Sequence, residues 1–317
     1  MKTVLLFISV ISLGFTSQAD IVRLEGEPFK PSTNTEIIWA ATNDLPKGLW
    51  IYKNMPEAFS WAVISNAMKI GRFTMKDCSK ATNPMYNDKR LIYFSNTNEY
   101  GLSKYLYIAP SVGVIEYHSE HAFKAPIENV PTTEETEQLG RGVLFQLGID
   151  KALLSEHVRN GYDETSSSLN VKTKQMSPAK TVVRGVSFAR KIDGIDISAN
   201  WSFLIHFRSN STVEDYILVW RNLLPYESRS VLATNQILES IKSGLSVLPE
   251  QAADFTLLNK AKKITITKVE ATYSYGDVGQ VDFVYPYADI EMAVDFGDSN
   301  IETYYLKCPI ILANVIK

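Results

Sequence analysis

The chain shows the same order of sequence patterns three times: apolar residues at helical spacing, followed by stretches where apolar and polar residues alternate. Phe59, Val63 and Ala67, for example, recur every fourth residue and form one buried helical stripe. An antiparallel sheet built from alternating strands has one apolar face that must be buried, and a single helix packed across that face is the simplest way to bury it. The sequence therefore predicts an α+β fold of repeated helix-plus-antiparallel-meander modules.

Helix start and stop signals set the limits of these modules. The first predicted helix, 56–70, has Pro56 at its first position and Gly71 at its end. The second follows Thr132 or Thr133, with Glu135 or Glu137 as the partner in a capping box, and closes at Gly148; the third follows Thr234 or Asn235 and closes at Gly244. We expect modules at 20–125, 131–226 and 227–317, behind a leader at 1–19.

Three local patterns refine this expectation. Residues 289–296 alternate apolar and acidic side chains, which predicts an antiparallel strand with one wet face. The apolar phase changes between Ile266 and Val269, which indicates a β-bulge in that strand. Residues 161–180 are rich in Ser, Thr, Asn and Lys without periodicity, which predicts an exposed loop.

The N-terminus has the three parts of a secretory signal peptide. Lys2 is followed by an apolar run at 4–13, and the small residues Ser17 and Ala19 mark a cleavage site. A short anchor is the alternative, but the run is too short for a hydrocarbon layer of about 30 Å. We expect a secreted or periplasmic protein without a stable membrane span after cleavage.

Charge and cysteine content narrow the functional class. The 32 basic and 35 acidic residues give a net charge of −3 without a basic block, which argues against nucleic acid as a partner. Cys78 and Cys308 are the two cysteines, and in an oxidising compartment they form a possible disulfide. Closing so long a loop contributes about 4–5 kcal/mol in the chain-entropy model. The alternative is two separate buried thiols.

The histidines do not form a recognised metal motif. His118 and His121 are three residues apart, but the H-E-x-x-H pattern of zinc proteases is missing. We expect both to be surface residues, as with His206, which lies on the less apolar face of its strand. The remaining histidine is His157.

Two short patterns imitate catalytic motifs. Ser177 and Lys180 spell S-x-x-K, but in a polar loop beside a proline and without a K-T-G strand. Asp295 begins a D-F-G triplet without the other kinase motifs; with Asp298 and Asn300 it suggests a loose calcium site or, more simply, a polar hairpin turn. The sequence thus predicts no cofactor, no metal and no catalytic residue, and an enzyme is the less favoured class.

Aromatic residues supply the candidate binding surface. Trp220 and Arg221 end a predicted strand, and Tyr285 and Tyr287 belong to a tyrosine-rich region near the C-terminus. Trp and Arg are common at binding hot spots, so these four residues form a possible binding surface. Their structural alternative is a buried Trp220 with a locally paired Arg221 and cross-strand tyrosine pairs.

One stretch resembles a known family. Residues 188–195 (F-A-R-K-I-D-G-I) are similar to the F-x-R-x-x-x-G-I turn of PepSY and YycH/YycI-like extracytoplasmic modules, and 220–223 (W-R-N-L) and Tyr285-Pro286-Tyr287 follow in the same order. The resemblance covers about 132–311. It implies PepSY-like or cystatin-like layers and a regulatory or protein-binding role without catalytic residues.

These observations favour a secreted, non-enzymatic binding or regulatory protein that acts on an unidentified protein or peptide partner. The alternative is a secreted hydrolase or glycan-binding protein with an aromatic-lined cleft. A pocket that gathers histidines, acidic residues or Cys78 would distinguish the second from the first.

Overall fold

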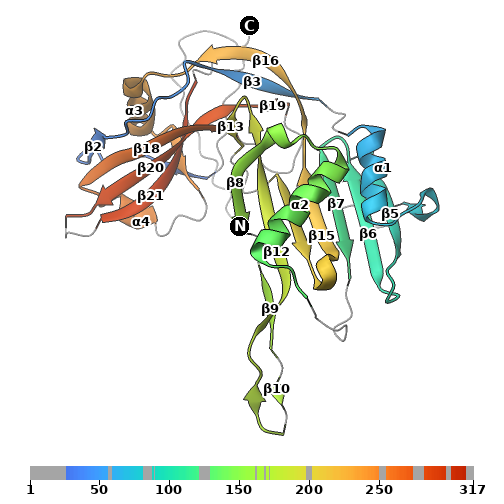
Figure 1. The fold of residues 1–317 in the computed structure, drawn as a ribbon. Helices are drawn as coiled ribbons and strands as arrows, with labels where there is room; N and C mark the ends of the chain where they lie inside the picture. The colour runs from blue at the N-terminus through green and yellow to red at the C-terminus, as the bar shows by residue number, and fades with distance from the viewer. Residues whose placement is uncertain are drawn as a thin grey trace, which may run out of the picture.

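A computed structural model describes residues 26–55, 59–80, 88, 90–120, 129–160, 163–167, 169–170, 172–197, 202–249, 255–273, 282–297 and 301–311. Two lobes built on antiparallel sheets stand side by side beneath a long β-arch, and a thin β-arm extends from one lobe (Figure 1). The predicted signal peptide lies outside the described residues.

The predicted α+β fold of repeated helix-plus-meander modules is wrong, because the protein is mostly β. Strands take up 50% of the described residues and helices 19%, with three helices longer than one turn among them. The reason is that strands pair across the predicted module limits. For example, β7 (Val114–Ser119) pairs with β15 (Val213–Val219), and β2 (Glu36–Trp39) pairs with β18 (Lys263–Tyr273).

The first lobe is a ten-stranded sheet with two helices on one face. Its order is β13-β12-β14-β15-β7-β6-β5-β4, and β8 and β9 pair with β12. The remaining strands are β4 (Cys78–Ser79), β5 (Ile92–Thr97), β6 (Ser103–Ala109), β8 (Leu154–Asn160), β9 (Glu164–Ser166), β12 (Lys180–Ile192), β13 (Ile195–Asp196) and β14 (Phe203–Phe207). Helices α1 (Trp61–Ile70) and α2 (Thr133–Leu147) pack on it through one continuous apolar core.

Local helix signals are confirmed for α2. Thr132 accepts a hydrogen bond from the Glu135 backbone N–H, and the Glu135 carboxylate accepts one from the Thr132 N–H, as a capping box requires. Gly148 ends the helix with φ +88°, a conformation that glycine adopts without steric cost. Helix α1 starts after Ser60, whose hydroxyl caps Val63 N–H, while residues 56–58 lie outside the described part.

The second lobe is a six-stranded sheet in the order β1-β17-β21-β20-β18-β2. The strands not yet defined are β1 (Glu27–Phe29), β17 (Ser246–Leu248), β20 (Pro286–Asp295) and β21 (Ile301–Pro309). Helix α3 (Thr234–Ser243), which ends at Gly244 as predicted, and the short α4 (Phe255–Leu258) accompany it, and α3 buries Ile237 and Ile241 in its core.

Two predictions for this lobe are confirmed. Strand β20 alternates buried Ile290, Met292 and Val294 with half-buried, mostly acidic positions, so one of its faces is wet. The pairing of β18 with β20 shifts register between Ile266 and Lys268, which is the predicted bulge. The wet face of the β18–β20 pair carries Lys268, Glu270 and Asp289.

The arch and the arm complete the fold. The arch is a three-stranded sheet of β16 (Asn222–Ser230), β3 (Gly48–Met55) and β19 (Phe283–Val284) that runs between the lobes (Figure 1). The arm contains β9, the start of β12, and the hairpin of β10 (Leu169–Asn170) and β11 (Gln175–Met176). The expectation of an exposed loop at 161–180 is therefore corrected: its described residues are exposed, but they form a strand ribbon.

Candidate binding cleft

The lobes meet at the tip of the β12–β13 hairpin. Asp193 and Gly194 both have positive φ, +51° and +78°, which gives the two-residue turn that an Asp-Gly pair favours. The Tyr52 hydroxyl, on the arch strand β3, donates a hydrogen bond to the Asp193 carboxylate. Ile197, just after β13, forms a parallel bridge with Tyr273 of β18. The hairpin therefore connects the first lobe to both the arch and the second lobe.

A buried layer makes this junction firm. Nine buried apolar side chains from both lobes and the arch form a cluster of their own: Tyr52, Ala109, Val112, Val114, Ile192, Ile197, Val219, Tyr273 and Val284. The Tyr52 and Tyr273 rings meet edge to face, and burial, with the Asp193 charge beside them, raises the pKa of both hydroxyls. Both therefore remain protonated donors, Tyr273 to the Trp50 carbonyl at 3.0 Å.

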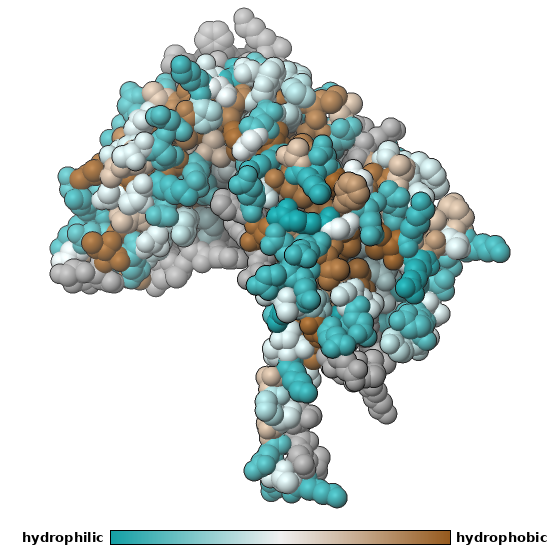
Figure 2. Space-filling view, viewed as in Figure 1, coloured by the Kyte–Doolittle hydropathy of each residue, from teal (hydrophilic) through white to brown (hydrophobic). Residues whose placement is uncertain are grey.

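Beside this junction a cleft of about 790 Å³ opens between the lobes. One wall is β8, β12 and β13 of the first lobe, and the other is the wet face of β18 and β20 with the loop at 43–46. Asn43 fastens that loop, because its amide donates to the Val269 carbonyl and accepts from the Val269 N–H. The molecular surface is indented between the lobes (Figure 2).

The cleft lining is acidic. Five carboxylates and two lysines among the described residues line it, a balance of −3: Asp44, Glu156, Asp196, Glu270 and Asp289 against Lys191 and Lys268. Lys268 and Glu270 pair at 2.8 Å on the exposed face. Asp196 accepts from the Ser155 hydroxyl at 2.8 Å through Oδ2. Such a surface attracts cationic groups.

The cleft continues onto the helix-free face of the ten-stranded sheet. Ser187, which lines the cleft, begins a row of directly paired residues that crosses five strands: Ser187, Leu204, Ile217, Glu116 and Tyr107. Beyond it, Tyr107 contacts Tyr93 and Tyr105, with ring centroids 4.6 and 5.1 Å apart. The Tyr105 hydroxyl donates to Glu116 at 3.4 Å, and burial together with the Glu116 charge raises the pKa of Tyr105 to about 12. We call Tyr93, Tyr105 and Tyr107 the tyrosine ladder.

A second cavity lies on the helix side of the same sheet, bounded by the end of α1, by α2 and by the loop before β15. It has a volume of about 730 Å³. The buried Lys104 ammonium lies at its floor, where it donates to the carbonyls of Gly71 at 2.9 Å and Arg72 at 3.3 Å. Burial lowers the pKa of Lys104. Gly71 is the C-cap of α1 and Arg72 follows it, so these hydrogen bonds tie the end of that helix to β6.

The predicted binding surface is mostly interior. Trp220, Arg221 and Tyr287 are 8%, 1% and 1% exposed, and Tyr285 is half-buried. The Arg190 guanidinium lies 4.4 Å from the Trp220 ring centroid and donates to the Arg221 carbonyl at 2.6 Å. Three of the four residues are therefore buried and present no surface to a partner.

The two cysteines are free and lie in different lobes. Cys78 is exposed on β4, at the edge of the ten-stranded sheet, whereas Cys308 is buried in β21. The possible disulfide between them is not formed in this structure. Burial raises the pKa of the Cys308 thiol to about 12, so it is protonated at neutral pH.

The histidines do not meet in a pocket. His206 is not solvent-facing, as its pattern had suggested: it is 7% exposed and pairs with Asp215. The half-buried His118 packs on Tyr105, with ring centroids 5.3 Å apart. His121 and the His157 side chain lie outside the described residues. Neither cavity is lined by a histidine or by Cys78 among the residues that the structure describes.

The remaining motif residues are accounted for by local structure. Ser177 and Lys180 lie in the arm, away from both cavities. Gly297, with φ +89°, donates its N–H to the Asp295 carboxylate at 2.6 Å, which is the polar turn. Asp298 and Asn300 are outside the described residues. Within the described residues, no group of three potential ligands is placed to hold a metal ion, and no helix is long and apolar enough to cross a membrane.

Sequence comparison assigns no relative to this chain. No model of a protein family matches it, and a search of curated proteins gives no match either. The PepSY-like resemblance therefore stays a prediction. The functional argument rests on the cleft, whose residues the sequence analysis did not select; the one local signal that pointed to it is the Asp193-Gly194 turn.

Proposed function

We propose that this protein is a secreted, non-enzymatic binding protein, and that the cleft between its lobes holds an extended, positively charged segment of a protein or peptide partner. The observation that carries the proposal is the lining of the cleft, with five carboxylates against two lysines on walls from both lobes. Opposite charges across an interface give specificity and a fast association rate.

The chemistry of the lining supports polypeptide as the ligand. Carboxylates such as that of Asp289 stand on strands β12, β18 and β20, or next to them, and the backbones of these strands run along the walls. The cleft volume of about 790 Å³ is at the upper end of the range for compact ligands, and the row leading to the tyrosine ladder extends the surface beyond it. An extended chain fits this shape better than one compact molecule.

A defined basic peptide tests the proposal. Fluorescein-labelled decalysine is titrated with the purified protein and followed by anisotropy, with decaglutamate as the charge-reversed probe. We expect decalysine to bind and decaglutamate not to bind. Binding should weaken steeply as ionic strength rises, because salt screens the partly exposed carboxylates over about 10 Å at 0.1 M.

Two matched variants localise the binding. Glu270→Lys/Asp289→Lys reverses two charges in the cleft, and we expect decalysine affinity to fall roughly tenfold or more. Glu134→Lys/Glu239→Lys makes the same net change on exposed positions of α2 and α3, outside the cleft, and should change affinity little. Equal losses in both variants, or no decalysine binding by the unaltered protein, would overturn the proposal.

The tyrosine ladder favours a second candidate, binding of a glycan. Neighbouring aromatic rings beside the Glu116 carboxylate suit the apolar face and the hydroxyls of a sugar. Tyr93→Ala/Tyr107→Ala should abolish retention on an insoluble polysaccharide such as cellulose or chitin if the ladder is the site. If the unaltered protein is not retained on either polymer, this candidate is refuted.

A further inference from the structure

The β-arm is the least explained part of the molecule. Its described side chains at 165–167 and 172–180 are all exposed, and Met176 is 60% exposed. In the space-filling view the arm stands clear of both lobes (Figure 2). An isolated two-stranded ribbon is marginally stable in water at best. A ribbon of this length therefore gains stability from a second surface.

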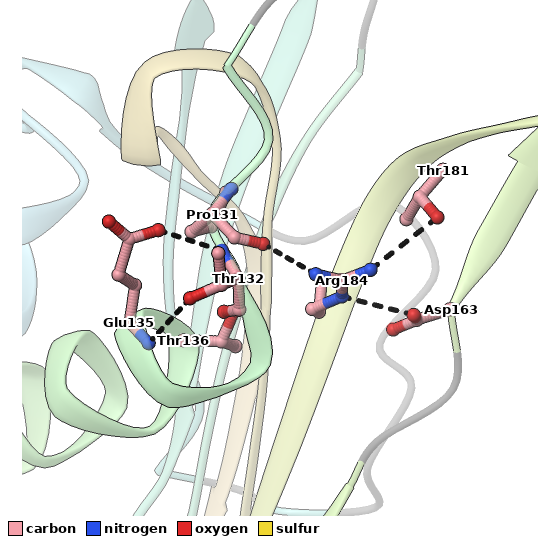
Figure 3. Close-up of polar contacts among 7 residues, drawn as sticks. All are labelled: Pro131, Thr132, Glu135, Thr136, Asp163, Thr181 and Arg184. Atoms are coloured by element: carbon pink, nitrogen blue, oxygen red, sulfur yellow. Dashed lines mark hydrogen bonds and ion pairs between the residues drawn. The ribbon is translucent and has the colours of Figure 1, made fainter.

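The root of the arm is fixed in direction. Arg184 of β12 donates to the Asp163 carboxylate at 3.0 Å, to the Pro131 carbonyl at 2.9 Å and to the Thr181 hydroxyl at 3.5 Å (Figure 3). Since Pro131 directly precedes the capping box of α2, one guanidinium ties the arm, the long strand and the helix start together. The direction of the arm is thus preorganised, which lowers the entropy cost of binding a partner.

The charge of the arm is opposite to that of the cleft. The outer part of the arm, residues 167–180, contains Lys172, Lys174 and Lys180 and no acidic residue, which gives a net charge of +3. Nearer the root, Asp163 pairs with Arg184 and Glu164 of β9 is half-buried, so the basic charge lies on the outer part of the arm. The cleft lining has a balance of −3. Lys174 is in the turn at the tip with φ +56°, a left-handed conformation that lysine adopts at a cost of about 1 kcal/mol or more.

The arm is placed so that it does not reach its own cleft. Both belong to β12, whose first residues form the arm and whose last residues, Ser187 to Lys191, line the cleft. Ser187 lies seven positions after Lys180, about 23 Å of extended strand, and the arm extends from the end of β12 opposite the β13 hairpin (Figure 1). In a two-fold dimer the direction of β12 is reversed in the second copy, and any contact of one arm with the cleft of the other copy is made twice.

We propose that the occupant of the cleft is the arm of a second copy of this chain, inserted reciprocally in a two-fold dimer. The proposal rests on the proposed function, because it names the basic segment that the acidic cleft holds. Two arms and two clefts contribute to one assembly, so the contact area doubles relative to a single insertion. Another basic polypeptide then has to compete with the arm for the same cleft.

Charge-swap variants test the dimer. The cleft variant is Glu270→Lys/Asp289→Lys, and the arm variant is Lys174→Glu/Lys180→Glu. Sedimentation velocity at low ionic strength should show a concentration-dependent dimer for the unaltered chain and a monomer for each variant. A mixture of the two variants should dimerise again, since each reversed arm then meets a reversed cleft and each unaltered arm meets an unaltered cleft. The Glu134→Lys/Glu239→Lys control should stay dimeric.

The outcomes separate the two proposals. If the unaltered chain is monomeric at every concentration but binds decalysine, the dimer is refuted and the acidic cleft stands. If the arm variant dimerises as the unaltered chain does, or the mixture fails to restore dimers, the arm is not the occupant. The monomeric arm variant should bind decalysine more tightly than the unaltered chain at high protein concentration, because its cleft is empty. A cleft variant that binds decalysine normally refutes both proposals.

Discussion

The Nδ1 atom of His206 lies 2.7 Å from the Oδ1 atom of Asp215, directly across the β14–β15 ladder. Burial opposes a charge on this imidazole, but the hydrogen bond to Asp215 and the nearby carboxylates of Glu214 and Glu164 outweigh it and raise the pKa of His206. The pair therefore joins two strands of the helix-free face with a charge-assisted hydrogen bond.

A dependence of stability on pH follows. Because the folded-state pKa of His206 lies above its unfolded value, the protonated pair stabilises the fold fully below about pH 6.5 and loses this contribution as the pH rises through the raised pKa. His206→Gln should lower the free energy of unfolding by about 1–3 kcal/mol at pH 5.5 and by less at pH 9. Urea denaturation of both proteins at the two pH values measures the difference.

The control for this prediction is His118→Gln. His118, on the neighbouring strand β7, is the backbone partner of Asp215 on the side opposite His206. Its side chain is half-buried and packs on Tyr105. Its replacement should leave the pH dependence in place. A loss of stability in His206→Gln that is the same at pH 5.5 and pH 9 contradicts the assignment of the charge to His206.

Two glycines of α2 should respond in opposite ways to alanine. A Cβ on Gly140 would stand 2.8–3.0 Å from atoms of Phe188 and Val186, whereas one on Gly142 meets nothing within 4 Å. Alanine is favoured over glycine in a helix by about 1 kcal/mol. Gly142→Ala should therefore raise the melting temperature. Gly140→Ala should lower it, since the clash pushes α2 off β12; equal effects would show that the helix is not pressed against the sheet there.

Some local sequence signals were confirmed, but two predicted helix starts were wrong, because α1 begins at Trp61 and the N-cap of α3 is Ala233. The capping box of Thr132 and Glu135, the closing Gly148 and the bulge after Ile266 each depend on residues a few positions apart. Pairing between strands that are distant in sequence does not depend on such neighbouring residues. Alternation at 114–119 marks a strand, but nothing in it selects β15 as the neighbour, and so the merging of two predicted modules into one sheet was not predicted.

The candidate site was missed for a related reason. Glu156, Glu270 and Asp289 occupy wet strand positions that read as ordinary solvent-exposed charges, and only the tertiary fold brings them to one cleft. Trp220 and Arg221 look like a binding pair in sequence, because composition cannot tell a hot spot from a buried sheet end. The arm at 161–180 lacked alternation since neither of its faces is buried, and alternation arises from burial of one face.

The state of the cysteines can be checked directly. Because both are free and only Cys78 is exposed, a thiol reagent such as 5,5′-dithiobis-(2-nitrobenzoic acid) should label one thiol in the native protein and two in guanidinium. A reductant should not change the melting temperature. No labelling even after denaturation without reductant would show a disulfide and would contradict the positions of Cys78 and Cys308.

The last prediction concerns the contact between the β12–β13 hairpin and the arch, beside the cleft. Asp193 has φ +51° at the hairpin tip and accepts the hydrogen bond from Tyr52, so it both shapes the turn and fastens it to the arch. Asp193→Asn keeps a side chain that tolerates the left-handed region and an oxygen that accepts from Tyr52. Asp193→Ala loses both and should cost about 2 kcal/mol.

Stability alone does not distinguish a local turn defect from a loosened junction. Amide hydrogen exchange does: in Asp193→Ala, protection should fall at Ile197 and across β13, where the first lobe meets β18 through Tyr273, while β20 and β21 keep theirs. Tyr52→Phe removes only the hydrogen bond and should reproduce the exchange change with a smaller loss of stability. If exchange at Ile197 is unchanged in both variants, the burial of Ile197 and Tyr273 is sufficient to hold the lobes, and the hydrogen bond does not control the cleft.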